Sequence, residues 1–390
     1  MSLSYGELVA RAKAQIREVS TADLAARLGD LPVILDVREP DEVRRGTLPG
    51  AVLLPLGQVD SAVSGAVPDK NTEVVVICSA GDRSALGALA MQRMGYADVA
   101  SMAGGFGLWR MQGHPWEVPV VDDRRIRYAR HLVLPGVGEA GQRRLGDARV
   151  AVLGAGGLGS PVALYLAAAG VGTIGIVDDD TVDLSNLQRQ ILHDTPSIGF
   201  AKVDSAAKTL ARLNPDVEVI GHPTRLVAAN ALEILDGYDV VVDGTDNFPT
   251  RYLVNDASLH LRVPVIHGSI FRWEGQVTVF DPYRGPCYRC LFPEPPPPEF
   301  APNCAEAGVL GVLPGVIGSI QATEALKLVL GVGESLAGRL LTYDALAEEF
   351  TTLRIDRDPS CPACADEKHP PVLVDYDDAC RYAGAVARGR

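Results

Sequence analysis

The sequence lacks several features that mark particular classes of protein. Its 36 Lys and Arg residues are outnumbered by 49 Asp and Glu residues, and the formal net charge of −13 argues against a nucleic-acid-binding face. The N-terminal stretch is polar and has no apolar core of a secretory signal peptide. The seven cysteines are odd in number and gather in pairs, unlike a secreted disulfide scaffold. We therefore expect a cytoplasmic protein that binds no nucleic acid.

One segment is apolar enough to suggest a membrane span. Residues 150–177 carry no charge and are longer than a bilayer crossing requires. They also contain many glycines, a proline and a strand–turn–helix–strand rhythm. We therefore interpret them as the buried core of an α/β domain and expect no contact with a membrane. A chain of 390 residues is long enough for two such domains.

This apolar segment carries a nucleotide-binding motif. A strand over 148–153 leads into a glycine turn at 154–159, then a helix of small residues and a second strand over 173–177. Glycines let the backbone approach a phosphate, and the N-terminus of the helix adds partial positive charge. Asp178 and Asp180 follow the second strand, about 20 positions after the turn, where either can hold a ribose or a magnesium ion.

The residues after this strand distinguish between two kinds of nucleotide. A dense polar cluster at 185–190 includes Arg189, and Lys202 adds a cation shortly downstream. A dinucleotide needs few cations once its pyrophosphate lies on the helix. A triphosphate that releases pyrophosphate needs several, because charge develops in the transition state. The cluster therefore favours ATP, although a single surface cation would carry no such meaning.

A further acidic residue follows a later buried strand. The apolar run 239–243 predicts that strand, and Asp246 lies just beyond its carboxyl end, where an open α/β sheet binds ligands. Asp246 is therefore a candidate ligand of magnesium or ribose, and its alternative role is to cap a helix near 249–255. The same rhythm predicts strands at 217–220, 263–268 and 276–280 and helices at 206–213 and 315–330.

Two Cys-x2-Cys pairs stand far apart in the chain, Cys287 with Cys290 and Cys361 with Cys364. Four thiolates complete a tetrahedral zinc site with no open position, so the predicted zinc is structural and not catalytic. Because the two pairs are far apart in the sequence, such a zinc ion would join two distant segments of the chain. Redox dithiols or a disulfide are the alternatives, and a cytoplasmic setting disfavours them.

Cys304 stands alone after a proline-rich stretch at 293–299 that can form neither a helix nor a central strand. We expect an exposed crossover there, and an unpaired cysteine on an exposed loop is a candidate nucleophile. An incidental loop cysteine is the alternative. The polar residues 366–390 receive no function, and we interpret Cys380 among them as incidental.

Another cysteine, Cys78, ends a predicted strand in the N-terminal part of the chain. A tight loop follows it and leads into a helix, so backbone N–H groups, the helix dipole and Arg83 all favour an anionic sulfur or persulfide. A buried, inert cysteine is the alternative. The surrounding sequence predicts a capped helix at 21–28, strands at 33–38 and 73–77, and a helix at 85–94.

The spacing of Cys78 and Arg83 separates two classes of reactive loop. Protein phosphatases carry Cys-x5-Arg, which wraps a phosphate, whereas this loop is Cys-x4-Arg and its smaller size suits sulfur. The runs at 35–55 and 103–115 resemble the rhodanese family of sulfurtransferases, which implies a rhodanese-like domain over 15–120 with a persulfide on Cys78. Rhodanese loops often have arginine directly after the cysteine, and Ser79 departs from that pattern, which argues against a preference for thiosulfate more than against persulfide chemistry.

Residues 123–365 resemble the ubiquitin-activating-like adenylyltransferases of molybdopterin and thiamine biosynthesis. The similarity rests on the runs at 154–161, 177–190, 199–202 and 243–247. It implies a homodimer in which Arg130 enters the partner subunit's site, and a Cys304 that attacks the activated carrier or resolves a mixed disulfide. The residues that it places at ATP are Gly157, Asp178, Ser185, Asn186, Arg189, Lys202, Asp246 and Asn247.

Together the two resemblances imply an α/β protein with a rhodanese-like domain followed by a Rossmann-like adenylylation domain. Such an enzyme uses MgATP to adenylylate the C-terminal glycine of a ubiquitin-like carrier ending in Gly-Gly. A Cys78 persulfide then converts it to a thiocarboxylate for molybdopterin, thiamine or related biosynthesis. The sulfur donor would be a cysteine desulfurase or thiosulfate. Two rival hypotheses remain: an NAD-binding oxidoreductase with a rhodanese appendage, for which no hydride-transfer site is visible, and a non-catalytic scaffold.

Overall fold

The chain folds into two compact units, Met1–Arg127 and Tyr128–Arg390. The computed structural model describes residues 4–27, 30, 32–118, 123–294 and 308–376. Each unit has one β-sheet with helices on both faces, so the predicted α/β class is confirmed. Within the described ranges no helix is both long and apolar enough to cross a bilayer.

The first unit is built on a five-stranded parallel sheet. Its strands lie in the order β1 (Arg17–Val19), β5 (Val99–Met102), β4 (Val74–Ile77), β2 (Val33–Asp36) and β3 (Val52–Leu53). The central strands are apolar along their length because helices bury both of their faces.

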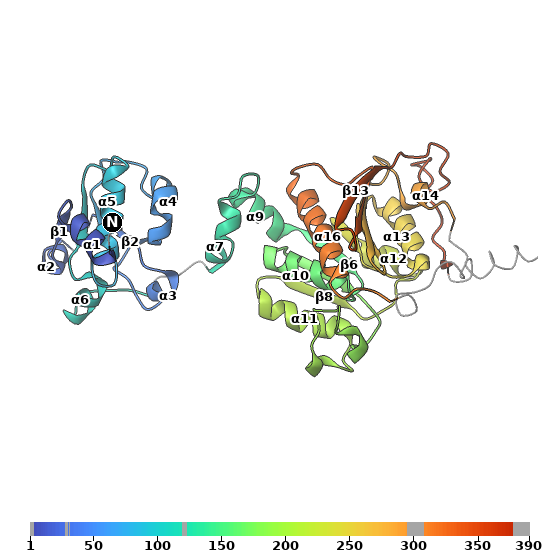
Figure 1. Cartoon of the computed structure of the whole chain (residues 1–390), viewed down its shortest axis with the longest axis horizontal. Coiled ribbons are helices and arrows are strands. Elements are labelled where there is room, and N and C mark those ends of the chain that lie inside the picture. Colours follow the sequence, from blue (N-terminus) through green and yellow to red (C-terminus); the bar gives the residue numbers. More distant parts are fainter. Residues whose placement is uncertain (1–3, 28–29, 31, 119–122, 295–307, 377–390) are drawn as a thin grey trace, which may run out of the picture. The chain divides into compact units, whose positions relative to one another are not determined.

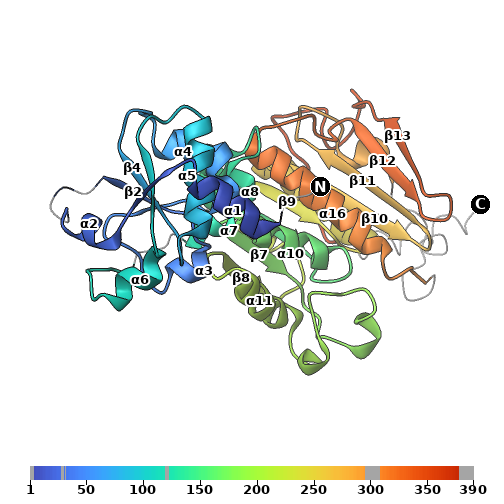
Figure 2. The same ribbon diagram turned by 60° about the vertical axis from the view of Figure 1, so that its left-hand side comes forward.

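Helices cover this sheet on two sides, as Figure 2 shows. One face packs against α4 (Val59–Ala66) and α5 (Asp82–Arg93). Helix α1 (Tyr5–Lys13) packs against α5. The other face packs against α2 (Thr21–Ala25) and α6 (Gly105–Met111). Shorter elements are α3 (Pro40–Val43), η1 (Leu56–Gln58) and α7 (Asp123–Arg127). The reactive-cysteine loop predicted from the sequence lies between β4 and α5.

The second unit is built on an eight-stranded mixed sheet. Five parallel strands come in the order β8 (Glu218–His222), β7 (Thr173–Val177), β6 (Arg149–Leu153), β9 (Val240–Asp243) and β10 (Val265–Phe271). Three antiparallel strands extend it, β11 (Glu274–Phe280), β12 (Arg339–Asp344) and β13 (Glu349–Arg354). After β6, the next two strands of the chain, β7 and β8, are added on one side of β6, and the following strand, β9, pairs with the other side. The strand order therefore reverses between β6 and β9.

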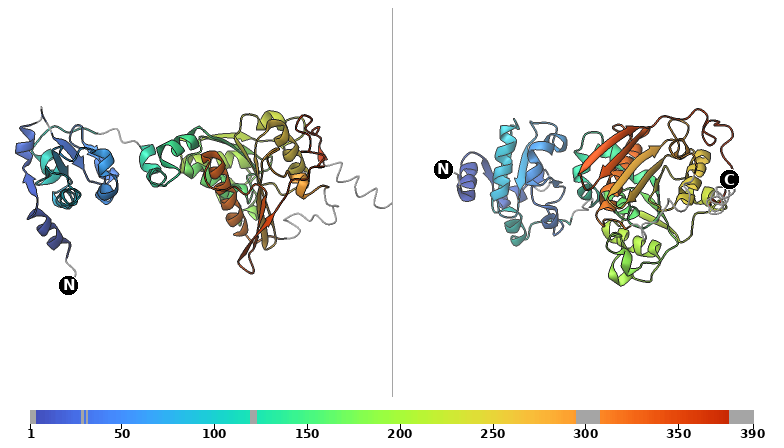
Figure 3. Two further views of the ribbon diagram at one scale, coloured as in Figure 1. Left: turned by 90° about the horizontal axis from the view of Figure 1, so that it is seen from above. Right: turned by 45° about the vertical axis from the view of Figure 1, so that its right-hand side comes forward.

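Two layers of helices enclose the parallel part of this sheet (Figures 1 and 3). One layer contains α9 (Gly138–Asp147), α10 (Gly159–Ala169), α11 (Lys202–Leu213) and α16 (Leu313–Leu330). The other contains α12 (Ala231–Leu235), α13 (Phe248–Leu261) and α14 (Tyr288–Leu291). Short elements α8 (Ala129–Leu132), η2 (Leu184–Asn186) and η3 (Thr195–Ser197) lie in the connections.

The predicted strands agree with the structure better than the predicted helices do. The strand predicted over 173–177 is β7 to the residue, whereas the helix predicted at 249–255 extends through all of α13. This helix has no internal glycine and ends at Arg262, which has a left-handed φ of 56°. The helix predicted at 206–213 begins earlier, at Lys202, because buried Lys202 and Val203 belong to its packed face although the first is charged.

Leu166 and its neighbour Tyr165 on α10 test the core of the second unit. Leu166 is 0% exposed and Tyr165 is 57% exposed. We expect Leu166→Ala to lower the free energy of unfolding by about 2–5 kcal/mol, because it leaves a cavity in a close-packed core. Tyr165→Ala is the matched control and should change it by about 0.5 kcal/mol or less. Calorimetric unfolding of both variants checks this, and equal effects would contradict the assigned packing.

Candidate functional site

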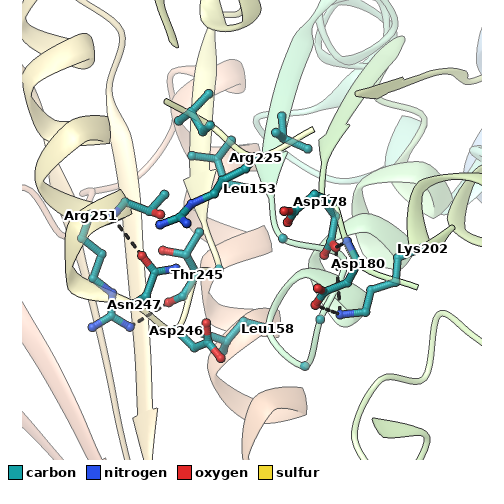
Figure 4. A pocket seen from close by; sticks show the side chains of 18 of the residues that line it. Leu153, Leu158, Asp178, Asp180, Lys202, Arg225, Thr245, Asp246, Asn247 and Arg251 are labelled. Atoms are coloured by element: carbon teal, nitrogen blue, oxygen red, sulfur yellow. Dashed lines mark hydrogen bonds and ion pairs between the residues drawn. The ribbon is translucent and has the colours of Figure 1, made fainter. Parts of the chain in front are cut away.

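A cavity of about 600 Å³ lies at the carboxyl ends of β6, β7 and β9, where the strand order reverses. Figure 4 shows Asp178, Asp180 and Lys202 on one wall and Thr245, Asp246, Asn247 and Arg251 on the other. The predicted nucleotide residues that line it are Gly157, Asp178, Asp180, Arg189, Lys202, Asp246 and Asn247. The structure therefore gathers seven of the predicted residues around one cavity.

The turn at the start of the cavity requires glycine at Gly159. A Cβ on Gly159 would lie 1.8 Å from the carbonyl oxygen of Gly154, so no side chain fits there. This close approach brings the N-terminus of α10 against the end of β6. An anion held at that terminus would meet the partial positive charge of the helix.

On one wall, carboxylates and a buried lysine are held together. Asp178 accepts hydrogen bonds from the N–H groups of Ala155 at 2.7 Å and Asp180 at 2.9 Å, and burial raises its pKa above the ordinary value. Lys202 is only 4% exposed, and its Nζ lies 2.7 Å from a carboxylate oxygen of Asp180 and 3.9 Å from one of Asp178. A buried lysine requires such partners to remain charged.

The same wall fits a divalent cation. Asp178, Asp179 and Asp180 each offer a carboxylate oxygen, and these atoms lie within 4.8 Å of one another. Carboxylate oxygens are the ligands that magnesium prefers in proteins. A cation there would also relieve the repulsion among three neighbouring carboxylates.

The opposite wall is the loop between β9 and α13. Asn247 caps α13, since its side-chain oxygen accepts a hydrogen bond from the N–H of Thr250 at 3.0 Å. The cap that we considered for Asp246 is therefore made by Asn247, and Asp246 lines the cavity without that task. Arg251, one turn into α13, donates a hydrogen bond to the carbonyl oxygen of Thr245 at 2.7 Å.

Three residues predicted for the nucleotide or the carrier are not among the described residues that line the cavity. Ser185 lies on η2, where its hydroxyl donates to Asp183 at 2.6 Å, and Asn186 ends the same turn. Arg130 is exposed on α8. Cys304 lies outside the described residues. The predicted roles of these residues at the nucleotide or the carrier remain predictions.

Sequence reasoning missed two arginines that line the cavity, Arg225 and Arg251. Arg225 follows the carboxyl end of β8, and the rule that ligands bind at strand ends would have found it. Arg251 stands four residues after Asn247, so it lies on the same face of α13 one turn further on. Phe248 lies between them in the chain and also lines the cavity.

In the first unit, Cys78 lies at the end of β4 as predicted. It is 1% exposed, and its sulfur accepts a hydrogen bond from the N–H of Gly81 at 3.1 Å and lies 3.4 Å from the hydroxyl of Ser84. Gly81 has a left-handed φ of 97°, which turns the loop back into the first turn of α5. The sulfur therefore meets one of the backbone N–H groups that we predicted and one hydroxyl, and its burial is also what the alternative of a buried, inert cysteine predicts.

Arg83, which we expected to favour an anionic sulfur, is engaged elsewhere in the loop. Its guanidinium donates to both carboxylate oxygens of Glu42, at 2.7 and 2.6 Å, and to the hydroxyl of Ser79 at 3.0 Å. These hydrogen bonds lower the pKa of Glu42 to about 2 and raise the pKa of Arg83. The loop therefore presents a neutralised pair at this position and not a free cation.

The four paired cysteines meet in space, although they are distant in sequence. The sulfur of Cys287 lies 3.8 Å from that of Cys290 and 3.6 Å from that of Cys361, and Cys290 lies 3.5 Å from Cys364. Four sulfurs around a tetrahedral zinc lie about 3.8 Å from one another, given Zn–S bonds of about 2.3 Å. The four residues therefore fit zinc in both donor chemistry and spacing.

Helix α13 also supports this cysteine cluster. The N–H of Tyr288, between the first two cysteines, donates to the side chain of Asn255 at 2.8 Å. The guanidinium of Arg289 donates to Asp256 at 3.2 Å. Since the first turn of α13 lines the nucleotide cavity, one helix holds parts of both sites.

Comparison with known proteins agrees with this pairing of units. Residues 128–363 match the ThiF family, and residues 20–112 match the Rhodanese-like domain. The first match covers more than half of the chain. The chain therefore belongs to the ThiF family, and it carries a rhodanese-like domain ahead of the ThiF region.

Several relatives match about two thirds of the chain. The chain is 55% identical over 259 residues to "Sulfur carrier protein adenylyltransferase" of Thermus thermophilus, covering 65% of this chain and 96% of the relative. It is 51% identical over 265 residues to "Probable adenylyltransferase/sulfurtransferase MoeZ" of Mycobacterium tuberculosis, covering 67% and 65%. It is 48% identical over 256 residues to "Adenylyltransferase and sulfurtransferase MOCS3" of Xenopus laevis, covering 65% and 57%. The match thus spans less than two thirds of the length of the last two relatives.

Solved structures resemble the fold of the second unit. E. coli MccB with ATP is 21% identical with a TM-score of 0.54, and the match covers 61% of this chain and 74% of that one. MccB with N-formylated MccA is 22% identical with a TM-score of 0.56, covering 63% and 77%. At these identities the likeness shows a shared fold.

The Glu42–Arg83 pair predicts a pH dependence of stability in the first unit. The folded pKa of Glu42 is about 2, below its ordinary value of 4.5. Its stabilisation is therefore present above pH 4.5 and is lost as the pH falls through the folded value. Because both side chains are about one third exposed, we expect about 1 kcal/mol or less.

Denaturant unfolding of the wild type and Glu42→Gln measures this effect. The wild type should be the more stable at neutral pH, and the difference should shrink as the pH falls from 4.5 to about 2. Asp41→Asn, on the same helix, is the control because Asp41 is 87% exposed. A wild-type advantage that stays constant with pH would contradict the assigned pair.

Proposed function

We propose that this chain is an ATP-dependent adenylyltransferase and sulfurtransferase that acts on a ubiquitin-like sulfur carrier. Its product is a carrier whose C-terminal glycine ends in a thiocarboxylate. The observation that carries this proposal is the cavity where the strand order reverses, in which a glycine turn, four carboxylates and several cations meet. The cradled cysteine in the first unit supplies the second activity.

The nucleotide would be bound by groups from both walls of the cavity. The glycine turn and the N-terminus of α10 face its phosphates, and Lys202, Arg189, Arg225 and Arg251 neutralise their charge. Magnesium would be held by Asp178, Asp180 or Asp246, and when bound it would neutralise phosphate charge. Asn247 and Asp246 position the nucleotide from the α13 side, and Ser185 and Asn186 contribute from η2.

The first step turns a poor electrophile into a good one. A carboxylate oxygen of the carrier's terminal glycine attacks the α-phosphorus of ATP, the bond to the bridging oxygen breaks, and pyrophosphate leaves. Charge grows on the departing pyrophosphate, so the cations of the cavity act mainly in the transition state. Arg130 of a second copy would add one more cation in a homodimer.

The second step transfers sulfur from Cys78. The terminal sulfur of a Cys78 persulfide attacks the acyl carbon, AMP leaves, and an acyl disulfide joins the carrier to Cys78. A thiol then attacks the sulfur of Cys78, the thiocarboxylate leaves on the carrier, and a disulfide remains for a dithiol to reduce. Cys304 is our candidate for the attacking thiol.

The charges around Cys78 favour one class of sulfur donor. Thiosulfate is a dianion, whereas the guanidinium of Arg83 is already neutralised by Glu42. A cysteine persulfide, as formed by a cysteine desulfurase, requires no such cation. We therefore assign persulfide donation to residues 15–120 and adenylylation to residues 123–365. Residues 366–390 form a tail without an assigned role, and we place the enzyme in the cytoplasm.

Cys78→Ala separates the two activities. We expect this variant to adenylylate a Gly-Gly carrier but to form no thiocarboxylate, because the acyl-adenylate meets no persulfide. Lys202→Ala should lose both, since adenylylation comes first. The measurement is intact-protein mass spectrometry of a candidate carrier after incubation with MgATP and a persulfide donor, followed by mild reduction.

Two outcomes would change this assignment. Thiocarboxylate formation by Cys78→Ala at the wild-type rate would remove Cys78 from the pathway. A wild-type protein that binds a nicotinamide dinucleotide and no ATP would support the oxidoreductase hypothesis instead. Omission of ATP is the internal control, because sulfur should then never reach the carrier.

The cysteine cluster predicts a zinc ion that stabilises the second unit. Elemental analysis should find zinc in the wild type and in Cys78→Ala, and should find it lost in Cys361→Ser, which removes one of four thiolates. Because binding of a structural metal contributes directly to folding, the Cys361→Ser variant and the chelated wild type should both unfold at lower temperature. Full zinc content in Cys361→Ser would be inconsistent with a four-thiolate site.

A further inference from the structure

A buried pair next to the nucleotide cavity has no role in the proposed reaction. Asp243 ends β9, and His267 lies beside it on β10, where the register pairs the two residues. The side chains of Asp243 and His267 are 2% and 1% exposed, and Nδ1 of His267 lies 2.8 Å from Oδ2 of Asp243. At this burial neither side chain can reach a nucleotide, so any effect on binding must pass through other residues.

Asp243 fastens the loop that forms one wall of the cavity. Its Oδ1 accepts hydrogen bonds from the N–H of Thr245 at 3.0 Å and from the Thr245 hydroxyl at 2.6 Å. The side-chain amide of Gln321 donates to the carbonyl oxygen of Asp243 at 2.8 Å. Thr245, Asp246 and Asn247 all line the cavity, so the orientation of the Asp243 carboxylate sets the position of this wall.

His267 in turn determines the orientation of that carboxylate. Burial lowers the pKa of His267, so the ring is neutral and its Nδ1–H donates to Asp243. Burial alone would raise the pKa of Asp243, but the hydrogen bond from His267 keeps it lowered, with a smaller effect of Arg251. Without this donor, Oδ2 of Asp243 would be a buried acceptor with no partner, and the carboxylate would turn or take up a proton.

We propose that His267 is a positioning residue for the nucleotide: through Asp243 and Thr245 it holds the loop that carries Asp246 and Asn247 into the cavity. The proposal rests on the proposed use of ATP. Its chemistry requires only a hydrogen-bond donor at position 267, because the ring takes no part in the reaction. A side chain of other shape that keeps the donor should therefore replace it.

Two nearly isosteric replacements isolate the donor from the packing. His267→Asn keeps an N–H group at this position, and His267→Leu fills the same volume without one. Calorimetric titration of the full-length protein with MgATP should give a dissociation constant about tenfold weaker for the Leu variant and within about threefold of wild type for the Asn variant. KM for ATP should rise in the Leu variant, while KM for the carrier stays unchanged.

Thr278→Val is the matched control. Thr278 is buried on β11 and pairs with His267 in the sheet register from the other side, away from the cavity loop. This variant should lower the unfolding temperature without changing the affinity for MgATP. A purely structural role of His267 predicts that the Leu, Asn and Thr278→Val variants differ in stability alone.

The possible outcomes are distinct. A Leu variant that binds MgATP within about twofold of wild type overturns the inference, as does an Asn variant as weak as Leu. A wild-type protein that binds no MgATP overturns the proposed function and the inference with it. If the Leu variant does not fold, His267→Gln and His267→Met replace the first two variants. Gln keeps an N–H donor on a longer side chain and Met has none, so we expect Gln to bind MgATP as the Asn variant does and Met as the Leu variant does.

Discussion

The nucleotide cavity depends on the direct pairing of β6 with β9. Where these strands end, the N–H of Gly244 donates to the carbonyl oxygen of Leu153 at 3.0 Å. A Cβ on Gly244 would lie 3.1 Å from that oxygen and 3.2 Å from the nitrogen of Gly159. The N–H of Gly154, which follows β6, also donates to the carbonyl oxygen of Val177 on β7 at 2.8 Å. Since β6 lies between the strands that carry the two walls, main-chain hydrogen bonds on both of its sides set the distance between them. Side chains on either wall then project into a space of constant width.

Cations in both units are paired with carboxylates. Lys202 is held by Asp180, and Arg83 is held by Glu42. Such pairs keep a charged side chain in one place at little gain in stability, since desolvation offsets much of the attraction. Their value lies in preorganisation: a phosphate that enters the nucleotide cavity finds Lys202 already in place. The ion pair beside Cys78 has a different consequence. Because Glu42 neutralises Arg83, little positive charge remains there to attract an anionic sulfur donor.

Much of the fold could be predicted from the sequence, and the reasons are physical. Strand β7 was predicted to the residue because a strand buried on both faces is an apolar run with sharp polar ends. Asp178 and Asp246 were found because they follow strand ends, and Lys202 because it adds a cation shortly after the polar cluster at 185–190. His267 was missed because it interrupts an apolar strand with one polar residue, and its partner is 24 positions away. The partner of Arg83, Glu42, is 41 positions away, so the spacing within the loop could not reveal that its charge is neutralised.

Helix α13 connects the nucleotide cavity to the cysteine cluster. Its first turn lines the cavity, and its middle turns hold Tyr288 and Arg289 beside the cysteines. Almost every residue from Thr250 to Leu259 is buried, so the helix cannot fray from one end without opening the other. In hydrogen exchange its amides should behave as one cooperative unit, the slowest in this layer. Ligand binding at either end of α13 would then slow the hydrogen exchange of amides at the other end, without a change in the backbone structure.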